Sequence, residues 1–100
     1  MFGVTPYLDS IKLLCKNNHV KELFIFGSAL SDSFSSTSDV DLLVDFHGMS
    51  PREYTSSYFN LKFSLEDMFG RPVDLLEKKE LRNPYLIQDI DSKKQLIYAS

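Results

Sequence analysis

The 100-residue sequence is poor in cysteine, in long apolar runs and in net positive charge. Its single cysteine, Cys15, excludes an intrachain disulfide, and the position of Cys15 on an apolar helical face favours a small core residue. The apolar runs span a few residues each, far fewer than the ~20 that cross a membrane. A formal net charge of −3, with both signs spread along the chain, argues against a dominant nucleic-acid-binding surface, although a local basic patch stays open.

The first residues also lack the pattern of a secretory signal. Lys12 and Lys16 interrupt the early apolar residues, and Pro6 lies among them. With one cysteine and no signal, we expect a reducing, cytoplasmic location. The length suits one compact domain, so residues 1–100 are interpreted as a single domain. A hydrophobic fraction of 43% allows that domain a real core.

The hydrophobic pattern predicts helices that alternate with short strands. Thr5 is the expected N-cap of the first helix, because a proline follows it. Ser50 and Glu53 form a capping box that opens a second helix, and Gly70 ends that helix. The predicted elements are, in chain order, a helix over 5–18, strands over 23–26 and 40–46, a helix over 51–69, a strand over 72–76, short helices over 77–81 and 84–90, and a final segment over 95–99 that fits a strand or a helix tail.

Gly27-Ser28 follows the apolar run 23–26 directly and is the first candidate for chemistry. Glycine lets a ligand approach the backbone closely. A short helix that began near Ser28 would direct free amides at a phosphate, and the Ser28 hydroxyl would add a donor. A plain strand-to-loop turn with Ser28 as its N-cap explains the same two residues, and the step taken alone favours that simpler interpretation.

Asp39 and Asp41 flank the first residue of the predicted strand 40–46. Residues two apart in a strand point to one face, roughly 6–7 Å from each other, so both carboxylates would project together. Such a pair repels unless a cation lies between its members. Magnesium, which prefers oxygen ligands and is shared with substrate phosphates, fits that arrangement. The alternatives are two solvated acids at a strand edge, or an Asp39 that bonds to its own loop.

Asp74 interrupts the apolar strand 72–76. A lone buried acid is costly, so Asp74 faces either solvent or the same site as the other two acids. If its strand pairs with 40–46, three carboxylates converge. Such a set can hold two metal ions and deprotonate an attacking hydroxyl.

Two histidines are not expected to carry chemistry. His19 and His47 are far apart and lack partners at metal-ligand spacing, so we expect exposed turn residues. The serine-rich segment 31–38 has the length and polarity of a surface loop.

The candidate residues form one combined pattern along the chain. It consists of Gly27-Ser28, nine intervening residues (29–37), Ser38-Asp39-x-Asp41 and the later Asp74. This pattern resembles the minimal nucleotidyltransferase family of the DNA-polymerase-β-like superfamily. The likeness continues into the segments 70–75 and 81–98 and covers roughly residues 8–98. The fold that the resemblance implies is α+β, a two-layer nucleotidyltransferase fold with a small mixed β-sheet and helices packed on one face.

The resemblance implies transfer of a nucleoside monophosphate, with ATP as the expected donor, to a hydroxyl group with loss of pyrophosphate. Gly27, Ser28 and Ser38 would bind the nucleotide. Asp39, Asp41 and Asp74 would be catalytic and would bind magnesium, expected as two ions, with Asp74 as general base for the acceptor hydroxyl. The protein would align the groups and neutralise charge rather than form covalent intermediates.

The resemblance also implies a partner. Minimal members of the family are typically paired with a HEPN-domain protein in toxin–antitoxin modules. The nucleotidyltransferase there is the antitoxin, and it adenylylates a tyrosine of the HEPN toxin or masks the toxin by binding. A homo-oligomer stays open, and we expect neither a membrane partner nor direct nucleic-acid binding.

One segment departs from the family pattern. Many members carry arginines soon after Gly-Ser, whereas residues 29–32 contain none and include Asp32. Arg52, Arg71 or Arg82 could supply the missing charge. The departure favours a second hypothesis, a nucleotidyltransferase-like binding module that neutralises its partner by contact, while the intact set of acids favours the enzyme. A third hypothesis is a structural α+β domain with an accidental motif.

Overall fold

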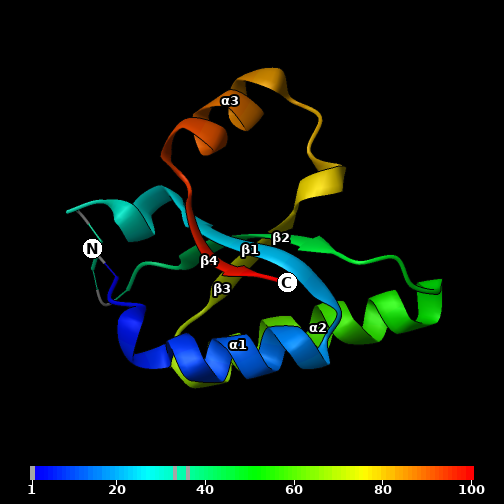
Figure 1. The fold of residues 1–100 in the computed structure, drawn as a ribbon. Helices are drawn as coiled ribbons and strands as arrows, with labels where there is room; N and C mark the ends of the chain where they lie inside the picture. Colours follow the sequence, from blue (N-terminus) through cyan, green and yellow to red (C-terminus); the bar gives the residue numbers. More distant parts are fainter. Residues whose placement is uncertain (1, 33, 36) are drawn as a thin grey trace.

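The computed structural model describes residues 2–32, 34, 35 and 37–100, so Ser33 and Ser36 of the predicted surface loop lie outside the described residues. The described chain forms a sheet with helices on both sides (Figure 1). Its elements are the 3₁₀ turn η1 (Thr5–Tyr7), α1 (Leu8–Asn17), β1 (Val20–Phe26), η2 (Gly27–Leu30), β2 (Val40–Phe46), α2 (Pro51–Phe69), β3 (Val73–Glu77), η3 (Lys78–Glu80), α3 (Pro84–Lys93) and β4 (Gln95–Ala99).

The sheet is mixed, as predicted, with the strand order β3-β2-β1-β4. The strand β1 pairs antiparallel with both β2 and β4, and β2 pairs parallel with β3. The long helix α2 provides the crossover that a parallel β2–β3 pair requires. The register of this pair places Asp41 beside Asp74. Two acids that are far apart in the sequence therefore become neighbours.

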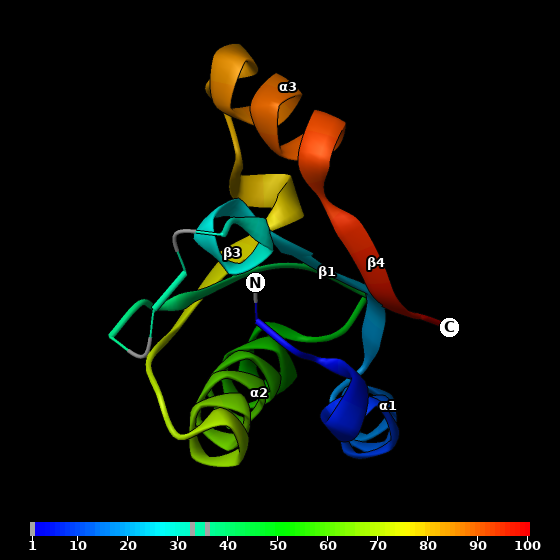
Figure 2. The ribbon, with the colours of Figure 1, turned by 90° about the vertical axis from the view of Figure 1, so that its left-hand side faces the viewer.

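One face of the sheet, which we call the helix face, is covered by α1 and α2, which lie side by side in Figure 2. Alternate residues of β2, Val40, Leu42 and Val44, point into this layer and are fully buried. Cys15 and Leu65 are likewise buried from the helix side, which confirms the predicted core role of the cysteine. This layer is the main hydrophobic core.

The opposite face, which we call the open face, carries a smaller cluster of Phe24, Phe26, Leu43 and Ile90. Ile90 belongs to α3, which lies over this face in Figure 1. The predicted α+β class is confirmed, and α1 and α2 follow the expected one-sided packing. The helix α3 departs from it because its buried residue, Ile90, packs against the open-face aromatics of β1.

The ends of the helices follow the predicted signals with two differences. The turn η1 has no side-chain cap, so Thr5 does not cap the first helix, and α1 begins at Leu8. The Ser50 hydroxyl accepts from the Glu53 amide at 3.2 Å and donates to Glu53 Oε1 at 2.9 Å. The capping box is thus closed through the hydroxyl rather than through the Ser50 amide. Gly70 ends α2 in the left-handed region, as predicted.

The C-terminal third resolves the remaining alternatives. The expected short helix over 77–81 is only the turn η3, and α3 extends beyond the predicted 84–90 to Lys93. The segment 95–99 is a strand, because it pairs with β1 at the edge of the sheet. His19 and His47 are exposed, as expected. Within the described ranges no helix combines the length and the apolar character needed to cross a membrane.

Candidate functional site

Gly27 occupies the point where β1 turns into η2. Its φ of +66° lies in the left-handed region, and a Cβ there would collide with Asp41 Oδ2. Both observations require glycine. Glycine at this position is predicted to make room for a ligand, and in the structure it also makes room for the carboxylate of Asp41.

Ser28 is bound to the same carboxylate. Its amide and its hydroxyl each donate to Asp41 Oδ2 at 3.4 Å. The turn η2 begins at Gly27 with Phe26 in the N-cap position, so the interpretation of Ser28 as the N-cap is wrong. Ser28 is exposed, and its two long hydrogen bonds leave the amide and the hydroxyl available to a closer acceptor.

The three predicted acids all lie on strands β2 and β3 or directly before them. Asp41 and Asp74 are register neighbours and both point to the open face. Asp39 lies two residues before Asp41, just outside the strand. Asp39 and Asp74 are exposed, and Asp41 is half-buried. Burial raises the pKa of Asp41, the hydrogen bonds from Ser28 oppose this rise, and the charges of Asp74 and Asp39 add to it.

The donor set suits a hard divalent cation. Among the described residues, no three acidic, histidine or cysteine side chains already form a metal-binding group, so a converged triad stays a prediction. Magnesium usually takes one or two carboxylates, keeps several waters and shares substrate phosphates. Repulsion between Asp41 and Asp74, which contributes to the raised pKa of Asp41, is the condition that a cation relieves. The residues therefore fit an ion that arrives with a phosphate ligand.

A pocket of about 460 Å³ lies beside Gly27 and Ser28. This volume is within the range of small-molecule sites. Its walls come from η2 and from the junction of α3 with β4, and the lining residues are Gly27, Ser28, Leu30, Ser31, Asp89, Lys93 and Gln95. The pocket thus adds a nearby cation, Lys93, to the Gly-Ser step.

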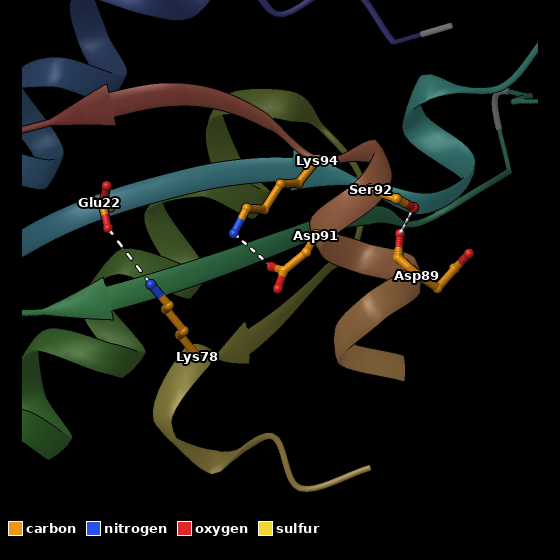
Figure 3. Close-up of polar contacts among 6 residues, drawn as sticks. All are labelled: Glu22, Lys78, Asp89, Asp91, Ser92 and Lys94. Carbon is orange, nitrogen blue, oxygen red and sulfur yellow. Dashed lines mark hydrogen bonds and ion pairs between the residues drawn. The ribbon is translucent and has the colours of Figure 1, made fainter. Parts of the chain in front are cut away.

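Figure 3 shows polar contacts within the α3–β4 segment and one between η3 and β1. Lys94 Nζ lies 2.7 Å from Asp91 Oδ1 and 4.4 Å from the centre of the Phe24 ring. Lys78 reaches Glu22 of β1 at 3.9 Å (Figure 3). The Lys94 ammonium thus joins the α3–β4 junction to β1 through the Phe24 ring, and the Lys78 pair joins η3 to β1.

Sequence reasoning missed Lys93. Its ammonium lies 3.0 Å from the carboxylate of Asp89, one helical turn earlier, and both residues line the pocket. The only signal in the sequence is the pair Lys93-Lys94 before the last strand. That pair could not be placed near Ser28 without knowing that α3 lies on the open face.

The three arginines proposed as substitutes do not line this pocket. Arg71 donates to the carbonyls of Ser35 and Ser38. Arg82 donates to the carbonyls of Lys79 and Leu81. Arg52 lines a different pocket, which is formed mainly by the end of α1 and the start of α2.

Ser38 was predicted to bind the nucleotide. Its hydroxyl accepts from the Ser35 amide at 3.1 Å and lies 3.2 Å from the Ser35 hydroxyl. Ser38 is not among the residues that line the pocket beside Ser28. In the structure it shapes the loop that leads to Asp39.

Comparisons with known proteins place this geometry in a family. The model of the nucleotidyltransferase domain family matches residues 9–97. A candidate protein adenylyltransferase of Methanocaldococcus jannaschii is 36% identical over 88 residues, which cover 88% of this chain and 85% of that protein.

Solved structures agree. A candidate minimal nucleotidyltransferase superimposes with a TM-score of 0.75 at 25% identity, covering 92% of this chain and 90% of that one. The structure of a tri-AMPylated Shewanella oneidensis HEPN toxin in complex with an MNT antitoxin gives a TM-score of 0.66 at 17% identity, covering 98% and 74%, and this likeness shows the fold alone. The chain belongs to the nucleotidyltransferase domain family, which confirms the predicted family, fold and enzyme class.

Proposed function

We propose that this chain transfers AMP from ATP to a tyrosine hydroxyl of a HEPN-domain protein and acts as the antitoxin of that toxin. The observation that carries the proposal is the pairing of Asp41 with Asp74 directly beside Gly27-Ser28. Two findings support the acceptor class: the match to a candidate protein adenylyltransferase and the shared fold with an antitoxin bound to an AMPylated HEPN toxin.

The nucleotide's triphosphate would lie against Gly27 and Ser28, in the pocket that Lys93 lines. The Ser28 amide and hydroxyl, held by Asp41 at 3.4 Å, would donate to phosphate oxygens, which are stronger acceptors when charged. Lys93 would exchange its pairing with Asp89 for the phosphates and so replace the arginines that residues 29–32 lack. Ser38 would act on the nucleotide site through the loop it shapes.

Asp39, Asp41 and Asp74 would hold magnesium, expected as two ions, which would neutralise charge on the phosphates. The acceptor oxygen forms a bond to the α-phosphorus, the bond from that phosphorus to the bridging oxygen breaks, and pyrophosphate leaves. Asp74 takes the proton of the acceptor hydroxyl as general base. Positioning and charge neutralisation supply the rate acceleration.

Access to the acids favours an acceptor carried by another protein. Asp74 is exposed on β3, which is an edge strand of the sheet. Asp39, also exposed, precedes β2 at the same end. A tyrosine side chain presented by a partner can therefore approach these carboxylates from solvent.

A second candidate function is a binding module that neutralises its partner by contact without turnover. Two observations favour it. Ala29 is buried where many relatives carry a cation, so the turn η2 itself offers no positive charge. Phe59 and Phe63 are exposed and stack on the surface of α2, with ring centres 5.7 Å apart. An apolar surface of this kind suits protein contact.

One experiment separates the two candidates. The chain is incubated with α-labelled ATP, magnesium and the product of the neighbouring gene, and label on that protein is measured. We expect label on a tyrosine, lost in Asp39→Asn and Asp41→Asn and after chelation of magnesium. Asp45→Asn is the matched control, because Asp45 lies on the same strand and the same face but at its other end. Tight binding without transfer, surviving both substitutions, would support the contact module.

A further inference from the structure

Arg71 joins the two segments that carry the exposed acids. It lies in the turn between α2 and β3, three residues before Asp74. Its Nη1 donates to the carbonyl of Ser35 at 2.9 Å and to the carbonyl of Ser38 at 3.2 Å. Ser38 directly precedes Asp39. One guanidinium therefore connects the loop before Asp39 to the turn that leads to Asp74.

Two aromatic rings hold this guanidinium in place. Its central carbon lies 4.7 Å from the centre of the Phe34 ring and 5.4 Å from that of Phe2. The two rings meet edge to face at 5.6 Å. A planar, weakly hydrated guanidinium can lie over such rings while one of its amino groups donates to carbonyls, whereas the compact, strongly hydrated ammonium of lysine has no planar face to stack.

Phe2 extends the same connection to the Gly-Ser step. Its amide donates to the carbonyl of Ala29 in η2 at 2.7 Å. Its ring also packs against Phe69, at the end of α2, with ring centres 4.9 Å apart. We call Arg71, Phe2 and Phe34 the clamp. The clamp touches η2, the loop before Asp39 and the turn before Asp74.

We propose that Arg71 is a positioning residue: through the clamp it fixes the loop that carries Asp39 relative to the strand that carries Asp74, and so sets the affinity of the acids for a divalent cation. The proposal rests on the proposed function, because it takes these acids as the metal ligands. Arg71 acts through backbone carbonyls and does not contact the nucleotide.

The physical reason is repulsion within the site. Asp41 and Asp74 are register neighbours, and Asp39 lies two residues before Asp41. Carboxylates this close repel one another, so the acids tend to separate. Asp41 is restrained by the sheet on both sides, whereas Asp39 precedes the first residue of β2. In the part of the chain that the structure describes, the Arg71 hydrogen bonds and the bond from the Val40 amide to the Pro72 carbonyl, at 3.1 Å, tie this loop to the turn before β3. The bonds between Ser35 and Ser38 lie within the loop itself. Removing Arg71 would therefore displace Asp39 first.

The test measures binding of Mn²⁺ alone by electron paramagnetic resonance to the full chain and to Arg71→Lys. Lysine keeps the charge and loses the planar group that lies over the two rings. Residues that orient metal ligands typically change metal affinity 10–100-fold when substituted, so we expect Arg71→Lys to weaken Mn²⁺ binding by about tenfold or more. Phe2→Leu, which removes a ring of the clamp, should weaken binding by a smaller factor.

Arg82→Lys is the matched control. Arg82 also donates Nη1 to two backbone carbonyls, at 2.6 and 3.2 Å, but these lie in and next to η3. Its substitution should leave Mn²⁺ affinity unchanged. Equal weakening in both arginine variants, or no weakening in Arg71→Lys, would overturn the positioning role.

A second measurement tests whether Arg71 fixes the loop, independently of metal binding. Hydrogen exchange of the amides at 37–41 should quicken in Arg71→Lys and stay slow in Arg82→Lys. If the unmodified chain binds no Mn²⁺, the proposed metal site fails. In that case hydrogen exchange alone tests the clamp. Faster exchange in Arg71→Lys supports the role of Arg71 in fixing the loop, and unchanged exchange rejects that role.

Discussion

The two faces of the sheet differ in how much apolar surface they bury. Among the described residues, the helix face has a cluster of 14 buried residues, whereas the cluster of the open face has four. One strand contributes to both faces, because alternate residues of β2 point to opposite sides of the sheet. Leu42 is buried in the core of the helix face, whereas Asp41 lies in the candidate site on the open face. Burial on one face therefore leaves the other free to carry repelling acids, and stability should be separable from activity.

The largest expected effect is on the open face. Asp41→Asn should reduce transfer of labelled AMP about 10³-fold, or roughly 4 kcal/mol of transition-state stabilisation. The free energy of unfolding should not fall, because burial and the neighbouring acids already disfavour the charged carboxylate. Label transfer and urea denaturation measure the two quantities. A variant that is inactive because it is less stable would contradict the separation of the faces.

The next effect is on the helix face. Leu65 is fully buried, so Leu65→Ala should lower the free energy of unfolding by about 3 kcal/mol through lost burial and a residual cavity. Phe63→Ala, two residues earlier on α2, is the control, because Phe63 is 57% exposed and its loss should cost about 0.5 kcal/mol. Urea denaturation compares them. Equal losses would mean that the helix face is not the principal core.

A smaller effect on the free energy of unfolding is expected for Gly27, directly after the end of β1. Gly27→Ala should cost about 1–2 kcal/mol, because alanine is strained at a φ of +66°. Its Cβ would also displace the carboxylate of Asp41, so Mn²⁺ affinity should fall as well. Gly48→Ala is the control, since no atom lies within 4 Å of a Cβ there. Unchanged Mn²⁺ affinity in Gly27→Ala would show that the contact with Asp41 is dispensable.

The smallest effect is a pH dependence. The folded state raises the pKa of Asp41 above its ordinary 3.8, so the native chain holds this proton more tightly than the unfolded chain does. The free energy of unfolding contributed by Asp41 therefore decreases as pH rises from 3.8 through the raised value. In Asp41→Asn this decrease should disappear. Urea denaturation across that window would detect it, and identical profiles for the two proteins would contradict the raised pKa.

Local patterns predicted the parts of the fold that depend on neighbouring residues. The strand β2 has the predicted bounds, since buried Val40, Leu42 and Val44 alternate along it and polar residues flank it. The helix α2 follows the signals of Ser50 and Gly70. The family and enzyme class followed from the spacing of Gly27-Ser28 and the acids. The roles of those residues stay predictions.

Contacts between distant segments could not be predicted in this way. The placement of α3 depends on Ile90 meeting aromatics of β1, and Lys93 reaches the pocket only as a result. The requirement for glycine at 27 was expected, but the carboxylate that enforces it belongs to Asp41 in the next strand. Thr5 failed as a cap because a 3₁₀ turn precedes α1.

Cys15 gives the chain a built-in reporter of its own opening. It is the only thiol in the sequence, it is fully buried in the helix face, and burial raises its pKa to about 12. A thiol reagent at neutral pH can modify it only after α1 separates from the sheet, because the reactive thiolate needs water. The rate at which Cys15 is modified therefore reports how often the helix face opens. Changes among the acids on the other side of the sheet do not affect that rate directly.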